Sequence, residues 1–174
     1  TNNQDNHKGS WGNANDARDV VLTDDFSQEG IYEAIRNYRV YATEDKNLEI
    51  HYTLNGQMLG STIKEAETAN IQVSVYDPDA SDSISKVEVV VNSGAVAYTW
   101  DDPAELASGE LECSIPANYS YYFIRVTQGD KNLAVTAPVW VGDVVKLGIS
   151  AVECGTATPV TGEELTLNTT LFNS

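Results

Sequence analysis

Basic residues are scarce in this sequence. Its 174 residues contain 10 Lys and Arg against 26 Asp and Glu, which gives a formal net charge of −16. Proteins that bind nucleic acid hold the phosphates with clustered Lys and Arg, so no nucleic-acid partner is expected. The acidic residues are spread along the chain rather than gathered in a tail, which indicates a soluble domain with some capacity for cations.

Long apolar runs are also absent. No stretch of about 18 or more apolar residues occurs, so no membrane span is expected. The first residues are polar and lack the apolar core of a signal peptide. The apolar fraction of 41% is nevertheless ordinary for a globular protein, so the chain can form a buried core.

Only two cysteines and two histidines are present. Cys113 and Cys154 lie in β-like runs without the CxxC spacing of a zinc or redox site, so they are either buried thiols or one disulfide. His51 lies on the strand face opposite Leu48 and Ile50, which predicts an exposed strand histidine rather than a metal ligand.

Most of the chain alternates apolar and polar residues with a period of two, which is typical of half-buried strands. The Asn55-Gly56 pair predicts a hairpin with a type I′ turn, because both residues tolerate positive φ. Several short strands separated by Asn, Asp, Gly and Pro clusters indicate a β-sandwich of seven or eight strands. The expected strands cover residues 48–54, 71–76, 86–92, 96–100, 110–115, 121–128 and 134–141.

Two stretches differ from this pattern. A short strand at Val20–Leu22 precedes a helix expected over Gln28–Tyr38, with Ser27 as its N-cap. This strand–helix pair is the only α/β-like element, and from the sequence it has no sheet to pack against. The segments 144–152 and 165–172 predict two further strands, which are either extra strands of the sandwich or the start of another module.

Three aspartates form the pattern Asp77-Pro78-Asp79-x-x-Asp82. Their carboxylates could bind calcium, which prefers oxygen ligands. The pattern lacks the regular spacing and the terminal Glu of an EF-hand loop, so an ordinary turn closed by an aspartate side chain is the favoured interpretation.

The beginning of the chain carries the most specific signal. Gln4-Asp5-Asn6-His7-Lys8-Gly9, followed by Trp11-Gly12 and Asn15-Asp16, resembles the last metal-ligand loop of PHP-type metallohydrolases, the polymerase and histidinol phosphatase superfamily. The secreted branch labelled CehA/McbA-like is the most similar. The similarity covers most of residues 4–142, continuing through 31–36, 39–48, 52–61, 121–126 and 137–141.

The resemblance implies a function for this loop. Asp5 and His7 would be the last ligands of a cluster of two or three divalent metal ions, with zinc, manganese or iron suited to such oxygen and imidazole donors. The metal would activate water against a small phosphate- or ester-containing substrate. Lys8 and Arg18 could hold an anionic oxygen of that substrate, although a solvated loop charge is the favoured interpretation of each.

The family's other ligands, including a His-x-His motif near the N-terminus, have no counterpart in these residues. We therefore expect the C-terminal part of a secreted or cell-surface PHP-type phosphoesterase, whose partner is the missing N-terminal part of the PHP domain. No catalytic set is complete in this chain, so by itself it is expected to be inactive.

The expected fold is mainly β: an immunoglobulin-like β-sandwich preceded by a short strand–helix remnant of a PHP α/β domain. The expected domains are the PHP-like end at 1–46, the sandwich at 47–142, and the start of a further Ig-like module at 143–174. The alternative function is a non-catalytic Ig-like binding or spacer module of a bacterial cell-surface protein.

Overall fold

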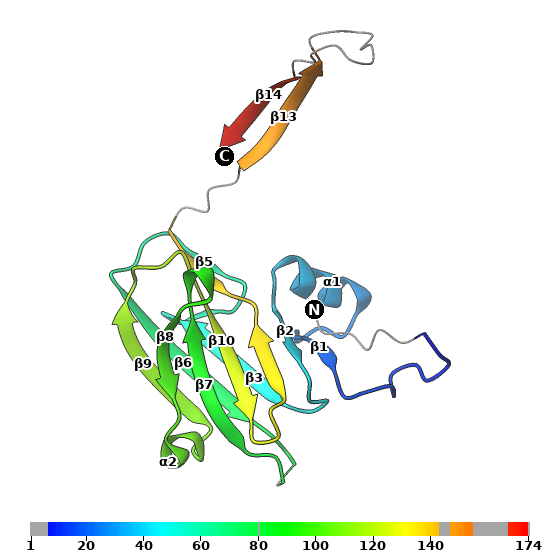
Figure 1. Ribbon diagram of the computed structural model, residues 1–174, viewed down its shortest axis with the longest axis vertical. Coiled ribbons are helices and arrows are strands. Elements are labelled where there is room, and N and C mark those ends of the chain that lie inside the picture. The colour runs from blue at the N-terminus through cyan, green and yellow to red at the C-terminus, as the bar shows by residue number, and fades with distance from the viewer. Residues whose placement is uncertain (1–6, 80, 143–146, 155–166, 174) are drawn as a thin grey trace, which may run out of the picture. The chain divides into compact units, whose positions relative to one another are not determined.

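The computed structural model describes residues 7–79, 81–142, 147–154 and 167–173. The chain forms two compact units, Thr1–Gly142 and Asp143–Ser174, and each is described by itself. Figure 1 shows that strands dominate the first unit, with its helices at the periphery.

One sheet of the first unit has four antiparallel strands in the order β4-β3-β6-β9. Along β3 and β6 alternate side chains are buried, as the period-two pattern predicts. The strands are β3 (Glu49–Leu54), β4 (Gln57–Met58), β6 (Thr68–Tyr76) and β9 (Glu110–Pro116).

The other sheet is centred on β10, which pairs with β7, β11 and β12. It continues from β11 to β2 and β1, from β7 to β8, and from β12 to β5, the last pair being parallel. The strands are β1 (Arg18–Val21), β2 (Val40–Thr43), β5 (Thr62–Ile63), β7 (Ile84–Val90), β8 (Val96–Trp100), β10 (Tyr121–Gln128), β11 (Leu133–Thr136) and β12 (Val139–Val141).

Apolar side chains from both sheets form one buried core. The buried Tyr52 hydroxyl on β3 donates to the carbonyl oxygen of Tyr122 on β10 at 3.2 Å, which links the sheets inside this core. The prediction of a mainly β, sandwich-like fold is confirmed. Large fully buried side chains include Leu48, Ile50, Tyr52, Leu54, Leu59, Ile71, Tyr122 and Ile124.

Helix α1 (Gln28–Arg36) begins where the sequence predicts, because Ser27 Oγ accepts a hydrogen bond from the Gly30 amide. The helix ends two residues earlier than expected, since Tyr38 has a φ of +55°. A second short helix, α2 (Pro103–Leu106), is capped by Asp102 and was not predicted. Figure 1 shows α1 beside β1 and β2.

The strand–helix pair does have a sheet, contrary to the expectation from the sequence. Strand β1 pairs with β2, an unpredicted strand, and β2 pairs with β11 of the sandwich. Tyr41 and Thr43 on β2 are buried. The predicted domain boundary between residues 46 and 47 therefore falls inside the first compact unit, whereas the boundary at 142/143 coincides with its end.

Two local predictions can be compared with the backbone. Asn55 and Gly56 have φ of +50° and +75°, so the type I′ hairpin turn is confirmed. The single strand predicted over 134–141 is instead two, β11 and β12, separated by Ala137 and Pro138. Proline has no amide to donate to a neighbouring strand, which explains the break.

The second unit contains β13 (Leu147–Cys154) paired antiparallel with β14 (Leu167–Asn173). These correspond to the two predicted strands. In the first unit, Cys113 is a free thiol, and burial raises its pKa to about 11. This shift keeps the thiol protonated near neutral pH, as expected of an unreactive, structural cysteine.

Candidate metal-binding sites

The predicted metal loop lies ahead of β1. His7 and Lys8 are exposed in the structure, and so are the residues that follow them as far as Asp16. Asp5 falls outside the described residues, so its position relative to His7 is not part of the structure. Trp11 is 79% exposed, and therefore it does not cover the loop from solvent.

Arg18 stabilises this loop by hydrogen bonds to its backbone. Its Nη1 donates to the carbonyl oxygens of Asn15 at 3.0 Å and Ala17 at 2.8 Å, and its Nη2 donates to that of Gly12 at 3.3 Å. Three hydrogen bonds to backbone carbonyls fix the guanidinium against residues 12–17. In the structure, Arg18 therefore stabilises the backbone of this loop. Its predicted role in holding a substrate anion stays a prediction.

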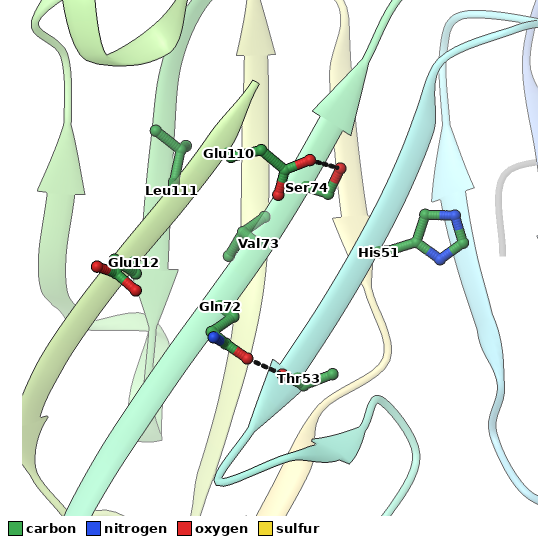
Figure 2. A pocket seen from close by; sticks show the side chains of 8 residues that line it. All are labelled: His51, Thr53, Gln72, Val73, Ser74, Glu110, Leu111 and Glu112. Atoms are coloured by element: carbon green, nitrogen blue, oxygen red, sulfur yellow. Dashed lines mark hydrogen bonds between the residues drawn. The ribbon is translucent and has the colours of Figure 1, made fainter. Parts of the chain in front are cut away.

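His51 lies on the outer face of the four-stranded sheet and is exposed, as predicted. Figure 2 shows it in a shallow surface depression with polar side chains from β3, β6 and β9. Ser74 Oγ donates to Glu110 at 2.9 Å, and Thr53 Oγ1 donates to Gln72 at 3.4 Å. The depression is a polar sheet surface rather than a group of converging metal ligands.

The structure instead brings metal-ligating side chains together at the aspartate pattern. Oxygen atoms of Asp45, Asp77 and Asp82 all lie within 4.8 Å of one another. Asp77 and Asp82 belong to the pattern identified in the sequence, and Asp45 lies just after β2. The predicted turn is also present, because the Asp79 amide donates to Asp77 Oδ1 at 2.8 Å. The two interpretations of this pattern are therefore compatible.

Gln128, the last residue of β10, contacts Asp45 and Asp77 and is 2% exposed. Its Nε2 donates to Asp77 Oδ2 at 2.6 Å and to Asp45 Oδ2 at 3.0 Å. Its Oε1 is buried and has no hydrogen-bond partner among the residues that the structure describes. We call Asp45, Asp77, Asp82 and Gln128 the aspartate cluster.

The electrostatics of the cluster disfavour the ionisation of Asp82. Burial raises the pKa of Asp82, and the negative charges of Asp77, Asp130, Asp45 and Asp79 raise it further. In the described parts of the chain, the ion pairs are Arg36–Glu29, Lys86–Glu88 and Arg125–Glu88. None of these includes a cluster aspartate.

Sequence reasoning missed Asp45 and Gln128, although Gln128 carries a signal. Tyr122, Ile124 and Val126 are the inward-facing residues of β10, and Gln128 continues their period of two. A polar side chain in the inward phase of a strand must find buried partners.

Comparison with known proteins gives relatives without an assigned function. The chain is 22% identical over 136 residues to an uncharacterized protein of Chlamydia pneumoniae and 24% identical over 137 residues to one of Chlamydia muridarum. A third, from Chlamydia trachomatis serovar D, is 23% identical over 137 residues. Each match covers 70% of this chain and 22% of the relative, so the chain spans about a fifth of their length.

No protein-family model matches the chain, and no solved structure matches it. Within the described residues, no helix has the length and apolar character needed to cross a membrane.

Proposed function

We propose that this chain is the C-terminal part of a larger, secreted PHP-type metal-dependent phosphoesterase, and that its β-sandwich is an accessory domain of that enzyme. In this proposal Asp5 and His7 complete a metal site whose other ligands come from the N-terminal part of the PHP domain. The substrate class is a small phosphate or ester.

The observation that carries the proposal is the exposure of large apolar side chains around α1. Five such residues lie within positions 11–38, and they are 45–89% exposed: Trp11, Phe26, Tyr32, Ile35 and Tyr38. A concentration of exposed apolar residues in one segment supports contact with other protein there. The missing part of a PHP domain would cover them, and the greater length of the three relatives agrees with a larger polypeptide.

The residues present fit a shared metal site only in part. Hydrolytic zinc sites use three protein ligands and leave one position for water, whereas this loop offers a carboxylate and an imidazole. A bound zinc, manganese or iron ion would supply an activated water and would stabilise negative charge on the substrate. His7 lies in an exposed loop, where it remains accessible to further ligands from another segment.

The alternative is a non-catalytic binding or spacer module of a bacterial cell-surface protein. The polar outer face of the four-stranded sheet favours it, because that face presents His51 and Tyr76, which is 58% exposed, beside the polar depression of Figure 2. Such a surface could contact a glycan or another protein without any metal.

The two proposals separate in an activity assay on the full-length protein encoded by the same gene. Hydrolysis of bis(p-nitrophenyl) phosphate is measured with added zinc, manganese or iron, for the wild type and for His7→Ala. The chain's other histidine supplies a matched control, His51→Ala. We expect metal-dependent turnover that is lost in His7→Ala and kept in His51→Ala. No turnover with any metal, or full turnover in His7→Ala, would favour the binding module.

A further inference from the structure

We propose that the aspartate cluster is a calcium site, formed by carboxylate oxygens of Asp45, Asp77 and Asp82 and by the side-chain oxygen of Gln128. This site is separate from the loop of His7 and does not depend on the phosphoesterase proposal. Its ligands lie in the β2–β3 connection, in the β6–β7 connection and at the end of β10.

The spacing of the carboxylates fits one calcium ion. Calcium binds oxygen ligands at about 2.3–2.6 Å, so two of its ligands can be at most roughly 5 Å apart. The three aspartates offer oxygens that all lie within 4.8 Å of one another. A single cation between them can therefore contact all three without a large movement of the backbone.

Gln128 provides an observation independent of the acidic residues. Its side chain is 2% exposed, and a buried amide normally uses both its oxygen and its nitrogen in hydrogen bonds. Here Nε2 has two carboxylate partners, whereas Oε1 has none among the described residues. The amide that carries this unpartnered oxygen lies against the Asp45 and Asp77 carboxylates. A half-turn of the amide would present the oxygen to a cation in the cluster.

The side-chain amide of Gln128 can also rotate by a half-turn without moving the rest of the residue. Its oxygen and nitrogen have nearly the same size and shape, so a half-turn of the group exchanges their positions. With the cluster empty of cations, Nε2 is the end that suits two carboxylates. With a cation present, Oε1 becomes the better end, so the Gln128 side chain can respond to binding without a change in the fold.

The negative charge of the cluster also favours a bound cation. Asp45, Asp77 and Asp82 bring three carboxylates within 4.8 Å of one another. No ion pair found in the described segments includes any of them. Like charges at this spacing repel one another, and a divalent cation reverses that repulsion.

The donor set selects the cation. Every proposed ligand is an oxygen, which favours hard cations such as calcium and magnesium over zinc or copper. Calcium accepts six to eight oxygens in an irregular arrangement, whereas magnesium requires a near-ideal octahedron and keeps most of its waters. Three carboxylates from two connections and one amide at the end of β10 suit the tolerant coordination of calcium better than the strict octahedron of magnesium.

A calcium ion here would join the two sheets. The β2–β3 and β6–β7 connections both cross from one sheet of the sandwich to the other. Asp45 lies in the first connection, Asp77 and Asp82 lie in the second, and Gln128 belongs to the central strand of the larger sheet. The proposed site thus acts as a structural clamp at this end of the sandwich.

The test uses the 174-residue chain, stripped of metal with EDTA and dialysed. Calcium chloride is titrated by calorimetry, and thermal unfolding is followed with and without 10 mM calcium. We expect one calcium per chain with a Kd of about 10⁻⁴–10⁻³ M, the range of extracellular modules. The unfolding midpoint should rise by about 5 °C at this calcium concentration.

Asp82→Asn is the variant that decides the assignment, because Asp82 lies in a partly exposed loop and the change is isosteric. In the absence of calcium it should raise the unfolding midpoint, since it removes one of the repelling charges. It should also abolish the calcium response. Asp24→Asn is the matched control: the same charge is removed from an exposed turn ahead of α1, so the calcium response should be unchanged.

Several results would overturn the proposal. These are the absence of calcium binding at millimolar concentrations, a calcium response that persists in Asp82→Asn, or one that is lost in Asp24→Asn. An equal response to magnesium would overturn the assignment of the cation. Because unfolding and calorimetry need no turnover, these outcomes are independent of the phosphoesterase assay.

Discussion

Gly60 sets how closely helix α1 can approach the sandwich. It follows β4 with a φ of +87°, and a Cβ atom added there would overlap the carbonyl oxygen of Asn37 and lie 2.8 Å from backbone atoms of Tyr38. Its amide is bound at the same time, donating to the Pro138 carbonyl oxygen at 2.9 Å. Gly60→Ala must therefore move the end of α1 or distort the loop that carries residue 60.

Gly56→Ala separates the two contributions to this cost. Gly56 has a similar φ of +75°, but an added Cβ would meet no atom within 4 Å. Forcing alanine to a positive φ costs about 1–2 kcal/mol, and the loss of glycine's freedom in the unfolded chain returns about 0.4–1 kcal/mol. We therefore expect Gly56→Ala to lower the free energy of unfolding by about 1 kcal/mol.

Gly60→Ala carries the same backbone cost and adds overpacking against rigid backbone, which costs about 1–3 kcal/mol. The total should be about 2–4 kcal/mol, measured by urea unfolding. Trp140 reports the displacement of the helix directly, because its ring contacts Tyr38 edge-to-face with centroids 5.4 Å apart. We expect a changed fluorescence spectrum in Gly60→Ala and an unchanged one in Gly56→Ala. Equal costs for the two variants would refute the close approach at Gly60.

Two further predictions concern the larger sheet. Deleting residues 1–38 should leave a single cooperative urea transition, whereas deleting residues 1–45 should weaken it, because β2 then no longer pairs with β11. Burial raises the pKa of Glu88, but hydrogen bonds from Arg125 and Lys86 outweigh burial and lower it below 4.5. Arg125→Met should cost about 1–2 kcal/mol at pH 7, and the cost should shrink as the pH falls through the lowered pKa and Glu88 is protonated. A cost that stays constant from pH 7 down to the onset of acid unfolding would contradict this.

The fold of the sandwich was largely predictable because its information is local. Alternation identified most strands, and the Asn55-Gly56 pair identified a turn that the backbone confirms. The turn is also held from outside, since the Asn55 side chain accepts from the Asn70 amide at 2.9 Å and donates to the Thr68 carbonyl oxygen. Local chemistry and tertiary contacts favour the same conformation there, which is why the prediction succeeded.

Strands β2 and β5 were missed for a physical reason. They have four and two residues, too few to display a period clearly, and both are defined by their partners. Strand β2 fits between β1 and β11, whereas β5 lies parallel to β12, some 80 residues further along the chain. Pairing between distant segments leaves little trace in the sequence of either one.

The aspartate cluster shows the same limit for a site. Asp77 and Asp82 are five residues apart and could be recognised together, but Asp45 and Gln128 are 83 residues apart and meet only through the pairing of β2, β11 and β10. Charge alone did not locate the site. A net charge of −16 spread along the chain predicts some capacity for cations, and only the fold shows which of the acids lie together.

The two ends of β10 are held by different chemistry. At its beginning, the Tyr122 carbonyl oxygen accepts from the Tyr52 hydroxyl, so a neutral hydrogen bond inside the apolar core connects the sheets. At its end, Gln128 meets carboxylates instead of apolar side chains. Under the calcium proposal, the stability of the sandwich at the Gln128 end depends on the ions around it, because a cation offsets the repulsion between the carboxylates. The neutral hydrogen bond at the Tyr122 end involves no charged group and has no such dependence.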